Sequence, residues 1–148
     1  MAVAYQLDDA LGLTLVLWDG MVTGHDAEEQ VRRLRADPYW PPGSLHLLDA
    51  TSVSSVPTVA DTKLIEMLAE MAETRQIRFA VIASDAFVEA TRFQPAASAV
   101  GVSRVIVFNE LSTACTWLGI DLTATRSTLA TLRSELREQR AHELREGP

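Results

Sequence analysis

Residues 13–26, with the sequence LTLVLWDGMVTGHD, contain a strand pattern that leads directly into a helix start. Residues 13–18 are predicted to form a strand, with Leu13, Leu15 and Leu17 on one face and Val16 and Trp18 on the other. Asp19-Gly20 is turn chemistry and is expected to close this strand. Thr23 then has the character of a helix N-cap, with Asp26 three residues later, a close relative of the capping box. The stretch therefore predicts a strand–helix unit.

The same alternation of strand and helix patterns continues on both sides of this unit. Residues 3–7 form a strand candidate that pairs with 13–18 as a hairpin at an edge of the sheet. Further strands are predicted over 45–48, 77–83 and 105–108, and helices between Thr23 and Asp37-Pro38, over 58–75, from residue 84 and after residue 108. Strands that alternate with helices imply βαβ units. The predicted fold class is therefore α/β, with a mostly parallel sheet of four or five strands and an antiparallel edge strand.

The C-terminal tail differs from the rest of the chain. It is rich in Arg and Glu and carries a narrow apolar stripe of Leu129, Leu132 and Leu136. We expect residues 1–120 to form one domain and residues 121–148 to form a C-terminal amphipathic helix. Three arrangements are open for this helix: docking on its own domain, pairing with a second copy or partner, or fraying.

Composition excludes several classes of function. The chain has 148 residues, 47% of them hydrophobic, with a net charge of −7. This charge argues against nucleic acid as a partner, because nucleic-acid binders carry a basic face. No signal-peptide pattern and no apolar run long enough for membrane insertion is present, so we expect a cytoplasmic protein. The single cysteine, Cys115, is expected to be a small buried thiol, and the three scattered histidines have no metal-site spacing, so no metal is expected.

A set of weak landmarks occurs in a recognisable order. They are Trp18-Asp19-Gly20-Met21-Val22-Thr23, Asp37-Pro38, the strand ending at Asp49, Arg92-Phe93, residues 104–108 and residues 114–118. Together they resemble the SpoIIAA-like (STAS/Sec14-type) family over about residues 3 to 120. The resemblance implies a SpoIIAA-like sheet of four or five strands wrapped by helices, and leaves the tail unexplained.

The resemblance also implies two kinds of function. Typical STAS domains are switches in which a serine is phosphorylated at the start of the helix after the third strand, within an Asp-Ser-Ser/Thr-Gly motif. This chain instead has Ser-Ser-Val-Pro-Thr-Val-Ala-Asp over residues 54–61, so it departs from the motif. Sec14-like relatives imply a bound lipid or other apolar ligand. We therefore expect a non-enzymatic regulatory module that binds a protein partner or forms a homodimer, with a carrier or sensor of a small apolar ligand as the alternative.

Two groups of polar residues are candidate ligand or regulatory sites. Asp49 is expected to end a strand at the carboxyl edge of the sheet, where open α/β folds place ligands, and to form a small polar site with Thr51 and Ser52. Its alternative role is to tie down the loop by accepting backbone N–H bonds. Thr58 is expected to be a helix N-cap, or else a phosphoacceptor at a helix N-terminus.

A third candidate site is apolar. Met67 and Met71 would line the mouth of a ligand pocket, although packing in the core explains the same residues. No Gly-x-Ser-x-Gly, Walker A or Gly-x-Gly-x-x-Gly pattern is found, so no catalytic residue and no cofactor is predicted.

Overall fold

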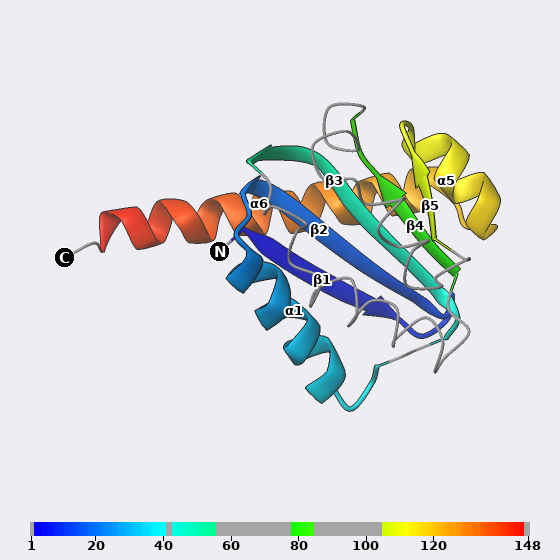
Figure 1. Ribbon diagram of the computed structural model, residues 1–148, viewed down its shortest axis with the longest axis horizontal. Coiled ribbons are helices and arrows are strands. Elements are labelled where there is room, and N and C mark those ends of the chain that lie inside the picture. Colours follow the sequence, from blue (N-terminus) through cyan, green and yellow to red (C-terminus); the bar gives the residue numbers. More distant parts are fainter. Residues whose placement is uncertain (1, 41–42, 56–77, 85–104, 147–148) are drawn as a thin grey trace.

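The computed structural model describes residues 2–40, 43–55, 78–84 and 105–146. Figure 1 shows a twisted sheet with helices packed against it. The sheet has five strands in the order in which they occur in the chain. The strands are β1 (Val3–Asp8), β2 (Leu13–Met21), β3 (Leu45–Ser55), β4 (Arg78–Ile82) and β5 (Val105–Phe108). The described helices are α1 (Gly24–Ala36), α5 (Leu111–Leu118) and α6 (Leu122–Arg145).

The pairing of the strands confirms the predicted fold class. β1 pairs antiparallel with β2, and β2, β3, β4 and β5 pair in parallel. β1 is thus the antiparallel strand at one edge of a mostly parallel sheet. Helix α1, which connects the parallel strands β2 and β3, packs on one face of the sheet. The other face is left for the helices that follow the last strand.

Local signals set the ends of helix α1. Thr23 accepts a hydrogen bond from the backbone N–H of Asp26, and the Asp26 carboxylate accepts one from the N–H of Thr23, so the predicted capping box is present. The helix ends at Ala36, directly before Asp37-Pro38. Its buried residues, which include Val31 and Leu34, pack on the sheet.

Two apolar layers cover the two faces of the sheet. On the face of α1, Val31 and Leu34 pack with Trp18 of β2 and Phe79 of β4. On the opposite face, α5 contributes a second cluster that contains the buried Cys115, as predicted for this thiol. Alternate side chains of each strand therefore belong to different layers, as expected for strands covered on both sides.

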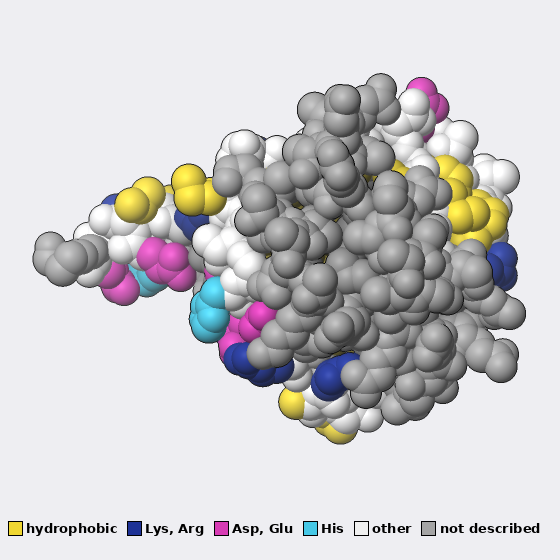
Figure 2. Space-filling model, viewed as in Figure 1, with side chains coloured by type: hydrophobic (Ala, Val, Ile, Leu, Met, Phe, Trp, Pro, Cys, Tyr) yellow, Lys and Arg dark blue, Asp and Glu magenta, His cyan; other side chains and the backbone are white. Residues whose placement is uncertain are grey.

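Helix α6 crosses the face of the sheet opposite α1, and its C-terminal end projects beyond the sheet (Figure 1). Leu132 and Leu136 are buried against Leu17 of β2, and Leu129 joins the α5 cluster. Of the three arrangements considered for the tail, docking on its own domain is therefore the one observed. The projecting end displays acidic, histidine and hydrophobic side chains (Figure 2), and it includes Leu144, which is 84% exposed.

Two predicted strand ends are wrong. Asp19-Gly20 does not close its strand, because β2 continues to Met21. Residues 52–55 are not a loop, because β3 continues to Ser55 and pairs with this extension of β2. Register shifts mark the extension, and Gly20 there has a φ of +80°, a conformation that favours glycine. The turn-like residues are thus a bulge inside a strand and not its end.

Candidate functional site

The predicted polar residues Asp49, Thr51 and Ser52 lie together in β3. Asp49 was expected to end the strand, which is wrong, since β3 runs on for several residues beyond it. One carboxylate oxygen of Asp49, Oδ1, accepts a hydrogen bond from the Thr51 backbone N–H at 2.9 Å and another from the Thr51 hydroxyl at 2.6 Å. Asp49 therefore ties down the backbone that follows it, within a strand and not in a loop.

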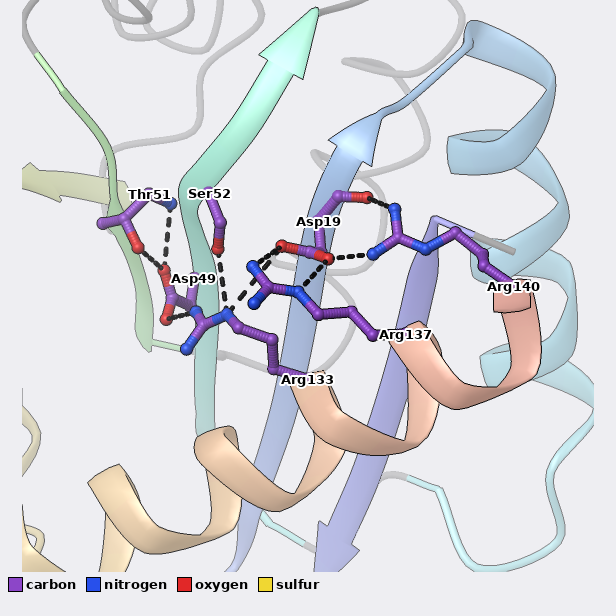
Figure 3. Close-up of polar contacts among 7 residues, drawn as sticks. All are labelled: Asp19, Asp49, Thr51, Ser52, Arg133, Arg137 and Arg140. Carbon is purple, nitrogen blue, oxygen red and sulfur yellow. Dashed lines mark hydrogen bonds and ion pairs between the residues drawn. The ribbon is translucent and has the colours of Figure 1, made fainter. Parts of the chain in front are cut away.

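Arg133 of helix α6 contacts Asp49 and Ser52 of β3 (Figure 3). Arg133 donates from Nη2 to Asp49 Oδ2 at 3.2 Å and from Nε to the Ser52 hydroxyl at 3.1 Å. Its Nε also lies 3.8 Å from a carboxylate oxygen of Asp19, in β2. Arg133 thus connects the neighbouring strands β2 and β3 to the helix that covers them.

Asp19 is the centre of the site. Its side chain is only 3% exposed and receives two parallel hydrogen bonds from Arg137, each of 3.3 Å. Arg140 donates to the same carboxylate and, at 3.3 Å, to the Asp19 backbone carbonyl oxygen. Figure 3 shows both guanidinium groups converging on this one carboxylate. Fork-like pairing of this kind is the strongest geometry available to an arginine and a carboxylate.

The spacing of residues on α6 explains how one helix serves the whole site. Arg133, Arg137 and Arg140 are separated by four and then three residues, so they share one face of the helix. Leu132 and Leu136 lie beside the arginines on the helix and are buried against the sheet. Their burial holds the arginines next to Asp19 and Asp49. The apolar stripe positions the helix, and the arginines bind the two carboxylates.

Gly20 allows one of these arginines to come close. A Cβ atom at position 20 would lie 2.5 Å from Nη1 of Arg140. The space is open because glycine has no Cβ atom, and its φ of +80° is a second reason for glycine at this position. The sequence of β2 and the position of Arg140 on α6 therefore depend on one another.

The charges of the site are nearly balanced. Burial by itself raises the pKa of Asp19, but the hydrogen bonds and positive charges of Arg137 and Arg140 outweigh it, so the pKa lies below the ordinary value. Three guanidinium groups face two carboxylates, those of Asp19 and Asp49. An ionised carboxylate held by several arginines is a poor general base, because its lone pairs are occupied and a proton would have to displace a cation.

Two other reactive side chains of the described residues are also in unsuitable states for catalysis. Burial raises the pKa of the Cys115 thiol, so it is not activated as a nucleophile. Burial lowers the pKa of His46 to about 3, so its ring is neutral and sealed from solvent near pH 7. His46 stacks on Phe79 with ring centroids 4.2 Å apart, and it faces the opposite layer of the sheet from Asp49.

The structure thus brings Asp49, Thr51 and Ser52 together, whereas the predicted residues Thr58, Met67 and Met71 lie outside the described residues. Sequence reasoning missed Asp19 and all three arginines. Their signal was present, as basic residues at positions i, i+4 and i+7 beside the leucine stripe, but an Arg- and Glu-rich helix was interpreted only by its leucines.

Within residues 2–40, 43–55, 78–84 and 105–146, no cluster of His, Cys, Asp and Glu has the arrangement of a metal site. In the same part of the chain, no helix combines the length and the apolar character needed to cross a membrane.

Sequence comparisons do not identify a relative. No protein-family model matches the chain, and no curated protein matches it.

Solved structures do share its fold. An uncharacterised protein of the DUF3478 family with a SpoIIAA-like fold, from Shewanella loihica PV-4, has a TM-score of 0.53 and 16% identity, over 79% of this chain and 94% of that one. An anti-sigma factor antagonist from Mycobacterium paratuberculosis has a TM-score of 0.52 and 18% identity, over 78% and 93% of the two chains. The anti-sigma factor antagonist SpoIIAA in its unphosphorylated form has a TM-score of 0.55 and 12% identity, over 80% and 99%. The predicted SpoIIAA-like fold is therefore confirmed.

Proposed function

We propose that this chain is a non-enzymatic regulatory module that works in the cytoplasm by binding a protein partner. Two of the solved structures that share its fold are described as anti-sigma factor antagonists, a name that defines each of them by its effect on another protein. Fold likeness alone is a weak argument for function, so the proposal rests on the candidate site.

The observation that carries the proposal is the closed charge network under α6. Asp19 lies near the carboxyl end of β2, and Asp49 lies in β3 level with Ile82, the last residue of β4, close to the end of the sheet where open α/β folds usually take their ligands. In this chain the two carboxylates are buried and bound by Arg133, Arg137 and Arg140. The polar groups at this end of the sheet are thus used to hold a helix, which is what an interaction scaffold needs and a catalytic site does not.

Native mass spectrometry on the protein purified under mild conditions from its own host tests the proposal. We expect a complex with one defined protein, which dissociates on denaturation and re-forms from the two purified components. The protein is purified by an affinity tag, and host cells that express the tag without this chain give the control. A species that carries only non-covalent mass of small-molecule size would contradict the proposal and favour the carrier of an apolar ligand.

The same measurement separates partner binding from self-association. A species of twice the chain mass, with no other protein present, would favour the homodimer. Covalent mass equal to phosphate would favour a switch of the STAS type, and peptide mapping would show whether Thr58 carries it.

A further inference from the structure

A groove of about 460 Å³ runs along the outer side of strand β1, between helices α1 and α6. Residues 3–5 of the edge strand form its floor. Gln30 and Arg33 of α1 line one wall, and Glu135 and Gln139 of α6 line the other. This groove lies apart from the arginine–aspartate site, which involves the inner strands β2 and β3. It is therefore a separate surface that the contacts of that site do not use.

Among the described residues, the backbone at the floor of the groove has hydrogen-bonding groups that no neighbouring strand uses. β1 is the outermost strand on this side of the sheet. The carbonyl oxygen of Ala2 accepts a bond from the Asp19 N–H at 2.8 Å, so Ala2 and every second residue after it face β2. Val3 and Tyr5 then direct their N–H and C=O groups away from β2 and toward the groove. Within the described residues, no other strand pairs with this edge.

The wall formed by α1 is held in place by hydrogen bonds. Gln30 is buried and donates from Nε2 to the Ala4 carbonyl oxygen at 3.1 Å, and its Oε1 accepts a bond of 2.8 Å from the Trp18 indole. The Tyr5 hydroxyl donates to Asp37 at 2.9 Å, just beyond the end of the helix. These bonds fix α1 relative to β1, so the groove is formed before any partner binds, which lowers the entropy loss on binding.

The helices beside the exposed edge of β1 limit which kind of chain segment can pair with it. Pairing with the β1 strand of a second copy would also bring that copy's α1 and α6 close to the same two helices. An extended segment without helices on its faces brings no helix with it. Strand addition of this kind gains affinity from main-chain bonds and specificity from alternate side chains.

The two walls define the chemistry of the added strand. Side chains that point toward α1 would meet Arg33, which also lies 3.9 Å from Glu29, so acidic residues there would add a second counter-charge. Side chains that point toward α6 would meet Leu132 and Leu136 beneath Glu135, so small apolar residues are favoured. We infer that this groove binds an extended segment of a partner protein, with alternating acidic and small apolar residues, as a strand added to β1. The inference rests on the proposed function and names the surface it would use.

Selection from a phage-displayed library of linear peptides tests the inference without knowledge of the partner. The full chain is the target, and Gln139→Trp fills the groove with an indole. Glu138→Trp is the matched control, because Glu138 is exposed on α6 but does not line the groove. We expect selected peptides to bind the Gln139→Trp variant at least about tenfold more weakly, a loss of roughly 1.4 kcal/mol, and the Glu138→Trp variant as tightly as the parent. Peptides that bind the filled groove as well as the parent would overturn the inference.

N-methylation of the selected peptides checks strand addition independently. Methylation of every second amide should abolish binding, whereas methylation of the amides between them should leave it nearly unchanged, because only alternate N–H groups face the neighbouring strand. Uniform tolerance of N-methylation would overturn the added strand. If a host protein binds the chain but binds Gln139→Trp equally well, the proposed function stands and the groove is excluded. If peptides bind the groove and no host protein binds the chain, the groove is a peptide-binding surface and the proposed function is contradicted.

Discussion

His46 and Asp19 are both almost fully buried, but their side chains lie on different faces of the sheet, and one is neutral whereas the other is ionised. His46 stacks on Phe79 of the neighbouring strand and is neutral, and its Nδ1 has no hydrogen-bond partner within the described part of the chain. Asp19 is ionised and is bound by arginines that lie more than a hundred residues later in the chain. The histidine is thus held by its neighbours in the sheet, whereas the aspartate depends on the docking of the last helix.

The comparison teaches what helix α6 contributes. Removing an ion from water is costly unless its partners replace the lost hydration. Without α6, the carboxylates of Asp19 and Asp49 would lose the arginines that bind them. The C-terminal helix is therefore an integral part of this fold.

The largest expected effect comes from removing the charge of Asp19. Asp19→Asn leaves Arg137 and Arg140 without their shared anion, while Arg133 keeps Asp49. We expect a loss in the free energy of unfolding near the lower end of the roughly 3–5 kcal/mol seen when one partner of a buried ion pair is removed, since Arg137 is 60% exposed. Urea unfolding measures it, with Asp9→Asn on the exposed turn as the control. Equal stability of the two variants would break the comparison.

The second expected effect is a pH dependence that comes from His46. Its pKa is lowered from 6.5 to about 3 in the folded protein, so below pH 6.5 the unfolded chain binds a proton that the folded chain does not. Stability should therefore be complete above pH 6.5 and fall by up to about 1.4 kcal/mol per pH unit as the pH drops toward 3, or about 2 kcal/mol between pH 7 and pH 5. Asp19 has a lowered pKa as well, and its contribution should be lost only below its ordinary value of 3.8.

His46→Phe is designed to separate these two windows. It keeps the stacking on Phe79 and removes the titrating group, so the fall in stability between pH 7 and pH 5 should largely disappear. His25→Gln, at an exposed site, is the control and should keep it. An unchanged fall in the His46→Phe variant would contradict the assignment.

Local and distant interactions also explain what the sequence could predict. The bounds of α1 follow from its capping box and from Asp37-Pro38, which are signals within the segment itself. The ends of β2 and β3 could not be predicted, because Asp19 is tolerated inside a strand only after distant arginines neutralise it. The grouping of Asp49 with Thr51 and Ser52 was predicted from their proximity in sequence.

The third prediction compares two glycines with positive φ. Gly20 has a φ of +80° and would place a Cβ atom against Arg140, whereas Gly119 ends α5 with a φ of +73° and would meet nothing within 4 Å. Gly119→Ala should therefore cost only the backbone strain, about 1 kcal/mol. Gly20→Ala should cost about 1–2 kcal/mol, because it also displaces Arg140. The extra cost of Gly20→Ala over Gly119→Ala should vanish when Arg140 is also replaced by alanine. Thermal unfolding of the two glycine variants, of Arg140→Ala and of the Gly20→Ala/Arg140→Ala double variant would show whether it does.

The smallest expected effect concerns the contribution of the Thr51 hydroxyl, an uncharged group, to holding the Asp49 carboxylate. The Thr51 hydroxyl donates to Asp49 Oδ1 at 2.6 Å, and Thr51→Val removes that donor while keeping a β-branched side chain. The Asp49 carboxylate would retain Arg133 and the Thr51 N–H, so we expect a loss of only about 1 kcal/mol in urea unfolding. Thr116→Val is the control, since that hydroxyl donates to a carbonyl oxygen on the exposed side of α5. If both variants are equally stable, Arg133 and the Thr51 N–H are sufficient to hold the Asp49 carboxylate. A larger loss would mean that Asp49 is held mainly by Thr51 of its own strand, just as His46 is held by its neighbours in the sheet.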